Sequence, residues 1–413
     1  MRIAFFNRSY WPDQAATGQL LTELSEDLVA RHGCRVTVVA GRPLHASGRA
    51  KGSETWSPVV REAHNGVSIL RSNGTRLRPG HFAARAANYL SYFAAAALAS
   101  RRLDRQDVVV SLTDPPIIGL AALRAARRTG ARFVFLCEDI FPEVAALLAD
   151  FRSPTVDRTL DRVNRRLLRE ADAVIALGDR MRRRLVEEKG ADPSRVHVIH
   201  NWVDCEAIVP GPRDNAFARA HGLVDRFVLM HSGNIGLSQN LEVLVDAAYR
   251  LRHDTRIAIV IVGDGTSRVA LQKRVAELGL TNVTFLPYQP KARLHESFAA
   301  ADAFLVSLKA GIEGYIVPSK LYGTLAAGRS YIAATDASAE PAVIARQHQC
   351  GLVAVPGDPA DLAAKIATLA SNRELTRTMG ERSRAAALQF DRRAAVRAYY
   401  DLFARVANLA TAA

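Results

Sequence analysis

Cysteines and long apolar runs are both scarce in this sequence. The four cysteines, Cys34, Cys137, Cys205 and Cys350, lie far apart and form no Cys-x-x-Cys pair. They support neither a disulfide framework nor a cysteine-ligated zinc site, and they suit a reducing compartment. No stretch reaches the roughly 18 uninterrupted apolar residues of a membrane span, and the first residues lack the apolar core of a signal peptide. We therefore expect a cytoplasmic protein, soluble or at the inner face of the cell membrane.

Acidic side chains are too few to balance the basic ones. The sequence holds 55 Lys and Arg against 41 Asp and Glu, a formal net charge of +14. Most of this excess lies in residues 1–200, which carry 31 basic and 21 acidic side chains. The charge predicts attraction to polyanions, but it does not distinguish nucleic acid, anionic lipid and phosphorylated substrates.

Neither glycine nor proline is frequent enough for a disordered or collagen-like chain. With 26 Gly, 17 Pro and 49% hydrophobic residues, the composition is that of a globular protein. A length of 413 residues exceeds one ordinary hydrophobic core, so two domains of roughly 200 residues are expected.

Short β-rich apolar runs alternate with helix-compatible segments along the whole chain. One series extends from RIAFF at 2–6 to RVHVIH at 195–200, and a second begins with RFVLMHSG after residue 222. Such alternation predicts parallel sheets covered by helices on both faces. The expected fold class is α/β, with two doubly wound, Rossmann-like domains facing across a cleft. The expected parts are a first domain at 1–200, a connector at 201–222, a second domain at 223–390, and a helix at 391–413 that crosses back to the first domain.

Two glycine-containing turns follow buried strands of the second half. In HSGNIGLSQN at 231–240, Gly233 and Gly236 would let backbone amides approach a ligand, and a helix start would favour phosphate. The turn at 263–265 has the sequence Gly-Asp-Gly. For both turns, the alternative is a tight connection with no ligand.

The loop between AFLVSL and KLYGTLAAG contains Lys309, Glu313, Ser319 and Lys320. Pro-Ser is a typical helix start, so we expect Ser319 to cap exposed backbone amides while Lys320 adds a cation beside the positive helix end. Such an arrangement suits a diphosphate. The alternative is a solvated cap with a surface lysine.

Polar and aromatic residues follow two strands of the first half. The loop YWPDQAATG at 10–18 offers Tyr10, Trp11 and Asp13 for acceptor binding, and the alternative is a loop that only packs on its own domain. Glu138 and Asp139 follow the strand RFVFLC, where carboxylates can orient hydroxyls or accept a proton. We find no metal-ligand spacing and no P-loop.

The segment 75–105 has arginines at both ends of an apolar middle. It is too short to span a bilayer but can lie in the interface, with its arginines on anionic headgroups. A buried helix with basic ends is the alternative.

The chain also contains, in this order, YWPDQAATG, EDIFPE, VIHNWVD, HSGNIGLSQNLEVLVDAA, VGDG, NVTFLPYQPKARL, AADAFLVSL and PSKLYGTLAAG. This series resembles family 4 glycosyltransferases of the GT-B fold, and more narrowly the bacterial branch that builds O-antigen, colanic acid and related exopolysaccharides. The resemblance implies retaining, metal-independent transfer of a sugar from a nucleotide diphosphate sugar, more often a UDP-sugar, to a lipid-linked or polysaccharide acceptor. It implies no cofactor besides this donor substrate. It also implies that the first domain, at 1–200, binds the acceptor and that the second, at 223–390, binds the nucleotide sugar.

The resemblance also implies roles for individual residues. Gly18 would face the donor diphosphate, Tyr288 and Gln289 would meet the base, and Ser319 and Lys320 would bind phosphate. The expected catalytic residues are Lys320, Asp139 and Glu313. The expected donor-binding residues are Gly18, Ser232, Gly233, Asn234, Gly263, Tyr288, Gln289, Ser319 and Lys320, and the expected acceptor-binding residues are Tyr10, Trp11, Asp13 and Glu138.

Two departures from the family pattern stand out. Asn234 and Gln239 occupy places where many relatives carry Arg and Lys. Many relatives also have two glutamates eight residues apart, where this chain has Tyr315 and Gly323, with Glu313 displaced by two residues. The missing cations make Lys320 the main candidate for stabilising the leaving diphosphate.

Two rival functions are weighed against this one. A non-hydrolysing sugar-nucleotide epimerase shares the architecture but changes the donor sugar with no acceptor present. A nucleic-acid-binding protein is suggested by charge alone, and the sequence lacks an aromatic-basic readout motif.

Overall fold

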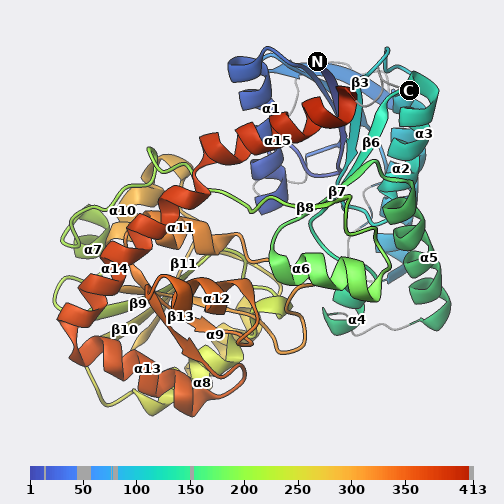
Figure 1. Cartoon of the computed structure of the whole chain (residues 1–413). Coiled ribbons are helices and arrows are strands. Elements are labelled where there is room, and N and C mark those ends of the chain that lie inside the picture. The colour runs from blue at the N-terminus through green and yellow to red at the C-terminus, as the bar shows by residue number, and fades with distance from the viewer. Residues whose placement is uncertain (14, 44–56, 76, 78–81, 149–152, 409–413) are drawn as a thin grey trace. The chain divides into compact units, whose positions relative to one another are not determined.

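Two units, each built on its own sheet, make up the chain (Figure 1). The computed structural model describes residues 1–408 apart from 14, 44–56, 76, 78–81 and 149–152. The first unit contains Met1–His200 and the chain from Ala395 onward, and the second contains Asn201–Ala394. The segment 201–222 therefore clusters with the second unit.

An eight-stranded sheet forms the centre of the first unit, in the order β3-β4-β2-β1-β5-β6-β7-β8. All neighbouring strands are parallel except β3 and β4, and Ile3 of β1 aligns with Val36 of β2 and Val108 of β5. The strands are β1 (Arg2–Phe6), β2 (Arg35–Gly41), β3 (Val59–His64), β4 (Val67–Ser72), β5 (Val108–Ser111), β6 (Arg132–Cys137), β7 (Ala173–Ala176) and β8 (Val196–Val198).

The strand β3 has no counterpart among the expected strands, because three of its six side chains are exposed and its apolar pattern is weak. It forms a hairpin with β4 across Asn65 and Gly66, which have φ angles of 47° and 81°. Positive φ at both turn residues is typical of a two-residue hairpin, and Asn-Gly is its strongest sequence signal.

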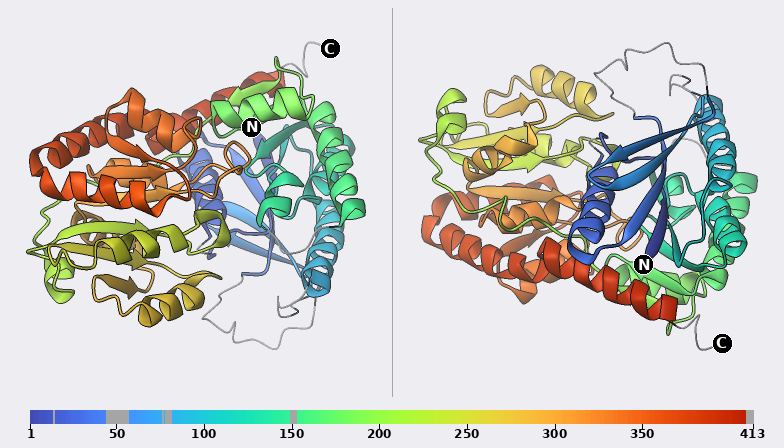
Figure 2. Two further views of the ribbon diagram at one scale, coloured as in Figure 1. Left: turned by 90° about the horizontal axis from the view of Figure 1, so that it is seen from below. Right: turned by 90° about the horizontal axis from the view of Figure 1, so that it is seen from above.

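Helices cover the first sheet. They are α1 (Ala16–His32), α2 (Phe82–Ser100), α3 (Ile118–Thr129), α4 (Glu143–Leu148), α5 (Pro154–Glu170), α6 (Asp179–Arg183) and, from Ala395 onward, α15 (Arg392–Asn408). Figure 2 shows α2, α3 and α5 side by side on one side of the unit. Tyr400 of α15 stacks on His32 of α1 with centroids 4.2 Å apart, and Phe403 meets Phe5 of β1 edge-on at 6.1 Å. The carboxyl-terminal helix is thus part of the first unit's core.

The second sheet is entirely parallel, in the order β11-β10-β9-β12-β13-β14. Its strands are β9 (Phe227–Ser232), β10 (Ile257–Val262), β11 (Val283–Leu286), β12 (Ala303–Ser307), β13 (Ser330–Ala334) and β14 (Gly351–Ala354). Its helices are α7 (Ala216–Ala220), α8 (Glu242–Arg250), α9 (Arg268–Glu277), α10 (Leu294–Ala299), α11 (Lys320–Ala326), α12 (Glu340–Gln347), α13 (Pro359–Ser371) and α14 (Arg373–Ala387).

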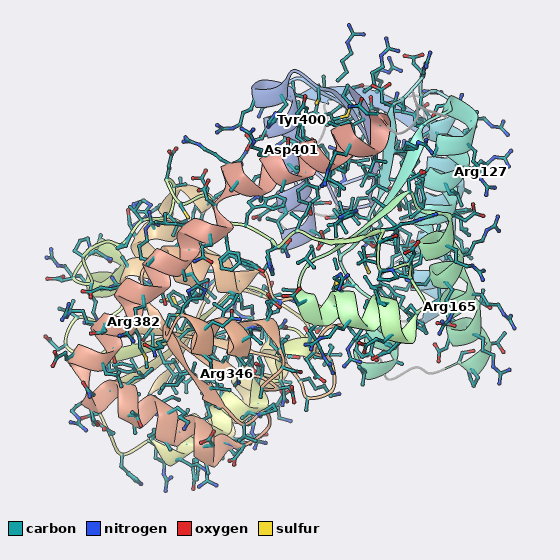
Figure 3. The ribbon with its side chains drawn as sticks, in the orientation of Figure 1. Arg127, Arg165, Arg346, Arg382, Tyr400 and Asp401 are labelled. Atoms are coloured by element: carbon teal, nitrogen blue, oxygen red, sulfur yellow. The ribbon has the colours of Figure 1, made fainter. Side chains whose placement is uncertain are left out.

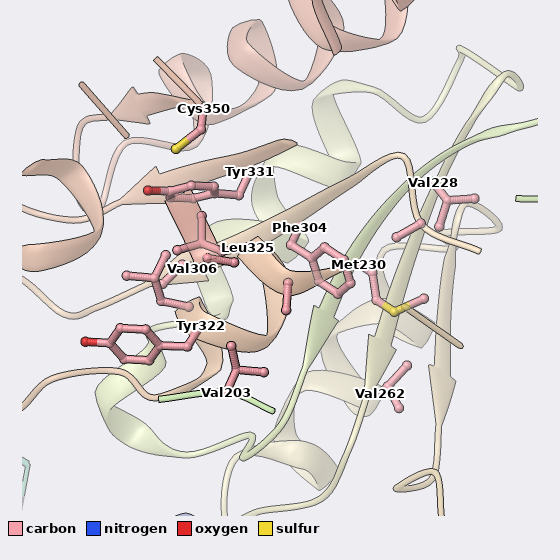
Figure 4. Close-up of a cluster of buried hydrophobic side chains, with 14 of the residues drawn as sticks. Val203, Val228, Met230, Val262, Phe304, Val306, Tyr322, Leu325, Tyr331 and Cys350 are labelled. Atoms are coloured by element: carbon pink, nitrogen blue, oxygen red, sulfur yellow. The ribbon is translucent and has the colours of Figure 1, made fainter. Parts of the chain in front are cut away.

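Apolar side chains cover both faces of this second sheet. On one face Val228, Val260 and Phe304 pack with Tyr322 and Tyr331 (Figure 4). A separate cluster on the other face includes residues that alternate with these along the same strands. Burial on both faces explains why the strands are continuous apolar runs such as IAIVIV.

Candidate functional site

The strand order of each sheet reverses once. The first sheet grows from β1 through β2 to β4 and then resumes with β5 on the other side of β1, and the second reverses in the same way between β9 and β12. Ligands of open α/β sheets bind beside the carboxyl ends of the strands at such a point. The loops after β1, β5, β9 and β12 are therefore the first places to examine for a site.

The turn after β9 is held by very close backbone packing. The Gly233 N–H donates to the Val262 carbonyl at 2.9 Å, and the Ile235 N–H donates to the Asp264 carbonyl at 2.8 Å. Gly263 has a φ of 137°, and a Cβ atom there would lie 1.9 Å from the Gly233 carbonyl oxygen. A side chain at 263 is therefore excluded, and the role of Gly263 in this structure is to support the turn.

Lys320 reaches the same turn from the first residue of α11. Its Nζ lies 3.2 Å from Nε2 of His231. Its Cε and Nζ lie 3.6 and 3.7 Å from the point that a Cβ atom would occupy on Gly233. The structure thus brings Lys320 to the turn formed by Ser232, Gly233 and Asn234.

His231, which no sequence argument placed in the site, is fully buried at the end of β9. Its Nε2 lies 3.2 Å from the Asn234 carbonyl oxygen, whereas its Nδ1 has no hydrogen-bond partner among the described residues. With the hydrogen on Nε2 the ring donates to Asn234, while the other tautomer would bury an unpaired N–H. Burial, followed by the charge of Lys320, lowers the pKa of His231 well below its usual value, so the ring is neutral.

The amino group of Lys320 also loses its proton more readily than an ordinary lysine. Although part of the side chain is accessible to solvent, burial of the amino group lowers the pKa of Lys320 to about 7. Because the Nε2 hydrogen of His231 is donated to Asn234, this ring nitrogen has no lone pair to accept a hydrogen bond from the Lys320 ammonium group 3.2 Å away. An anion placed beside Lys320 would favour its charged form.

Ser319 does not cap the helix, and that expectation is wrong. It occupies the N-cap position of α11 with φ −60° and ψ −23°, and its side chain makes no capping hydrogen bond. A capping side chain requires an extended backbone at this position, whereas Ser319 already has the helical conformation. The helix itself begins at Lys320 as expected.

The loop after β11 meets the turn after β10. The Tyr288 hydroxyl donates to the Asp264 carbonyl at 3.4 Å, and 46% of the Tyr288 side chain remains exposed. Gln289 is partly exposed and its amide donates to the Pro287 carbonyl at 3.0 Å. Both residues therefore present accessible polar atoms beside the Gly263–Gly265 turn.

In the first unit, three carboxylates gather where β5 and β6 end. Burial, followed by the charge of Asp139, raises the pKa of Glu138 to about 8. Burial, followed by the charge of Asp114, raises the pKa of Asp139 to about 7. Mutual repulsion and poor solvation thus hold part of this group in the neutral form near pH 7, which is typical of functional sites.

Arg8 and Asp114 were missed by the sequence analysis. The Arg8 Nε lies 3.2 Å from the Asp114 carboxylate, so this ion pair joins the loops after β1 and β5 across the switch point. The signal available in the sequence is that each charged residue closely follows a buried strand.

The loop after β1 and the start of α1 differ from residue to residue in how far their side chains are buried. Tyr10 is fully buried, so the expectation that its side chain contacts an acceptor is wrong. Asp13 is 6% exposed and accepts a hydrogen bond from the Ser9 hydroxyl at 3.2 Å. A Cβ atom on Gly18 would lie 2.8 Å from that same hydroxyl oxygen, so Gly18 lets α1 start close to this loop.

Trp11 is the accessible aromatic residue of that loop. It is 36% exposed and stacks on His64 with ring centroids 3.9 Å apart. Together with Glu138, which is also partly accessible, Trp11 offers a surface that a ligand can touch.

Two family models together match most of the chain. A "Glycosyl transferase 4-like domain" matches residues 17–202, and "Glycosyl transferases group 1" matches residues 214–386. The chain belongs to the family 4 glycosyltransferases of the GT-B fold. It is therefore a glycosyltransferase.

Individual relatives agree with this membership. The chain is 28% identical over 267 residues to the probable glycosyltransferase WbjE of Pseudomonas aeruginosa, covering 64% of this chain and 66% of that protein. It is 26% identical over 357 residues to the putative colanic acid biosynthesis glycosyl transferase WcaI of Escherichia coli, covering 82% and 84%. The crystal structure of Anabaena HepE in complex with UDP superposes with a TM-score of 0.74 at 17% identity, covering 98% and 100%.

The residues that depart from the family pattern have local explanations in this glycosyltransferase. The Gln239 amide oxygen accepts the Gly236 N–H at 3.0 Å, so Gln239 closes its own turn. A Cβ atom on Gly323 would lie 3.1 Å from the Phe298 ring, so a glutamate there would press on Phe298. Glu313 lies partly buried in the loop between β12 and α11, and its catalytic role stays a prediction.

Within the described part of the chain, none of the helices combines the length and apolarity required to cross a membrane.

The contact between Gly263 and Gly233 generates a stability prediction. Gly263→Ala should lower the free energy of unfolding by about 2–4 kcal/mol, because the new methyl group clashes with backbone and the φ angle is unfavourable. Gly279→Ala is the matched control: its φ is also positive, at 62°, but no atom lies within 4 Å of the added Cβ. Urea unfolding should show a loss of only about 1 kcal/mol for the control; equal losses in both variants would contradict the packing argument.

Proposed function

We propose that this glycosyltransferase moves a sugar from a nucleotide diphosphate sugar, with UDP-sugars preferred, to a lipid-linked or polysaccharide acceptor in cell-surface glycan synthesis. Two relatives support the proposal: WcaI is described as a colanic acid biosynthesis glycosyl transferase, and HepE was solved with UDP and with UDP-glucose. The observation that carries it is the approach of Lys320 to the turn after β9.

In the proposed mechanism Lys320 binds the diphosphate. Breaking the bond from the sugar to its phosphate oxygen leaves negative charge on the diphosphate, and a buried cation stabilises that charge better than one in water. The negative charge of the bound donor raises the pKa of the Lys320 amine, so the amine becomes protonated beside the diphosphate. His231 is a positioning residue, because its buried ring fixes where the Lys320 amino group lies.

We propose that Glu138 and Asp139 orient the acceptor hydroxyl. Their raised pKa values leave a carboxylic acid group able to donate a hydrogen bond and a carboxylate able to accept one. In the proposed front-face reaction the hydroxyl oxygen attacks the anomeric carbon while its proton passes to the leaving phosphate, which gives retention. This route needs no paired nucleophilic carboxylate.

Metal independence belongs to the same proposal. It is supported by the amino group that Lys320 brings to the turn after β9, which the charge of a bound diphosphate would hold in its charged form. Transfer measured after treatment with a chelator tests this part.

The overall function is tested with radiolabelled nucleotide sugars and lipid-linked acceptors. Label should enter the acceptor only when enzyme, donor and acceptor are all present. Conversion of the donor sugar without acceptor would instead favour an epimerase.

The first variant to test is Lys320→Ala. It should lower turnover about a hundred- to thousand-fold, because the leaving diphosphate loses its cation, and it should leave the far-UV spectrum and melting temperature close to wild type. The control Lys273→Ala removes a lysine whose side chain is 77% exposed. It should change neither the turnover nor the spectrum and melting temperature. Full turnover by the Lys320 variant would remove this residue from the mechanism.

Binding of UDP should depend on pH through Lys320. With its pKa near 7 in the free protein, the amine is neutral at pH 8, whereas beside a diphosphate it is charged. Binding at pH 8 should therefore take up close to one proton, and affinity should fall by up to about tenfold for each pH unit above 7.

Calorimetry in buffers of different ionisation enthalpy measures this proton uptake. Lys320→Arg, which keeps a permanent cation, should bind UDP at pH 8 without taking up a proton. Zero uptake by the wild type at pH 8 would refute the assignment.

We further propose that the first unit attaches to the inner face of the cell membrane. On α2, Leu90 and Leu98 are 59% and 41% exposed. They are eight residues apart, about two helical turns, so they lie on the same face of the helix. The neighbouring helices α3 and α5 carry exposed arginines at 124, 127, 158, 162, 166 and 169, and Figure 3 labels Arg127 among them. Apolar and basic side chains on adjacent helices suit an anionic lipid surface. Residues 76 and 78–81 of the segment expected to touch the membrane lie outside the described residues.

Membrane attachment is tested with the double variant Arg158→Glu, Arg162→Glu. It should reduce co-sedimentation with phosphatidylglycerol vesicles at least about tenfold, since each basic residue near the surface contributes about 1 kcal/mol. The double variant Arg346→Glu, Arg382→Glu makes the same change in net charge on exposed residues of the second unit. Equal losses in both double variants would show only an effect of net charge.

A further inference from the structure

A cavity of about 440 Å³ lies in the second unit, away from the Lys320 site. Its lining includes Asp302 and Arg329, which directly precede β12 and β13. It is therefore at the amino ends of the strands, whereas Lys320 and the turn after β9 are at the carboxyl ends. We call it the arginine cavity, because Arg329, Arg373, Arg377 and Arg384 line it together with only two carboxylates, Asp302 and Glu381.

Each of these two carboxylates already has its own cation. Asp302 accepts hydrogen bonds from Arg213 at 2.8 Å, from Arg373 at 2.7 Å and from the Val228 N–H at 2.7 Å. Glu381 is paired with Arg377 one helical turn earlier. Neither carboxylate is left to balance the other two arginines.

Among the described residues, Arg329 and Arg384 donate to backbone carbonyls. Arg329 donates from one amino group to Gly211 and Ala299, at 2.8 and 2.7 Å. Arg384 donates to the carbonyls of residues 205, 208 and 326, at 2.9 to 3.0 Å. No carboxylate of the described residues lies within ion-pair distance of either guanidinium, and Asp302 acts on Arg329 only through its charge at longer range.

Arg329 is also incompletely hydrogen-bonded. Its Nε is buried and has no partner among the described residues, and burial lowers the pKa of this guanidinium from its usual value. A structural brace between carbonyls accounts for the bonds that Arg329 makes. It does not account for a buried Nε–H group without a partner, which is costly unless a ligand completes it.

Close packing fixes the walls of the arginine cavity before any ligand arrives. A Cβ atom on Gly380 of α14 would lie 2.5 Å from the Gly328 carbonyl oxygen, and one on Gly328 would lie 2.8 Å from Pro210. The segment that carries Arg329 therefore sits directly against the helix that carries Arg377 and Arg384. A preformed wall lowers the entropy cost of binding.

We propose that the arginine cavity binds the phosphate group of a phosphate ester. The planar guanidinium presents paired donors that match phosphate oxygens, and it is the usual residue for this task. The cavity exceeds the size of a bare phosphate and falls in the range of small-molecule sites, so an ester with a small organic group fits. A phosphorylated metabolite and a phospholipid headgroup are two sources of this one chemistry.

The test is calorimetric titration of the full chain with inorganic phosphate and with glycerol 3-phosphate, at constant ionic strength. It is carried out in the Lys320→Ala background as well as in the wild type, so that phosphate at the donor site does not contribute. Saturable binding in both proteins is expected, and its absence in both would overturn the proposal whatever the outcome for the donor site.

Exposed residues of the cavity provide variants that leave the fold intact. Arg377→Gln should weaken phosphate binding about tenfold, because a charge-assisted bond is lost. Glu381→Gln, which releases Arg377 from its partner, should tighten binding several-fold. Arg382→Gln on the same helix, where the side chain instead meets Gln349 and is labelled in Figure 3, should have no effect. Binding that ignores both the Arg377 and the Glu381 variant would place the phosphate elsewhere and refute the proposal.

Vesicles of phosphatidylglycerol distinguish the two sources. Vesicle binding that Arg377→Gln weakens, together with binding of glycerol 3-phosphate, would assign the cavity to a lipid headgroup. Binding of the soluble ester with no effect of Arg377→Gln on vesicles would assign it to a metabolite.

Discussion

The contact between Gly263 and the carbonyl oxygen of Gly233 sets the geometry of the second unit's site. It lets the ends of β9 and β10 approach until the Gly233 and Ile235 amides bond to the neighbouring turn. Because these two N–H groups are already hydrogen-bonded, they are not available to a ligand. A ligand at this turn contacts the open side of Gly233 instead. The cation must then come from another element, and Lys320 of α11 supplies it.

Poor solvation of charged groups is common to the sites of both units. Burial is the first cause of the lowered pKa of Lys320 and of the raised pKa values of Glu138 and Asp139. The pKa of each group therefore lies near neutral pH, so the charge of a bound substrate can change its protonation state. Structural ion pairs also perturb pKa values, but these three groups lie at strand carboxyl ends, where α/β sheets bind ligands.

Much of the fold and part of the site could be predicted from the sequence. The alternation of apolar runs with amphipathic segments is a local pattern, so it identified two parallel α/β units. The edge strand β3 was missed because its exposed side chains weaken that pattern, although Asn65-Gly66 marked the hairpin. Ser319 and Tyr10 were misjudged for the same reason: a residue type suggests a cap or a ligand contact, but backbone angles and burial decide it.

The sequence by itself determined the fold class, the family and the position of Lys320 at a helix start, because these depend on periodicity and on the order of short motifs. Only the tertiary structure decided that Lys320 meets His231, that Arg8 joins Asp114, and that Arg329 and Arg384 donate to backbone carbonyls. The first two of these contacts join residues 89 and 106 positions apart, and Arg384 donates to a carbonyl 176 positions away. Their distances and burial arise only when separate strands and helices pack together, so no local pattern in the chain records them.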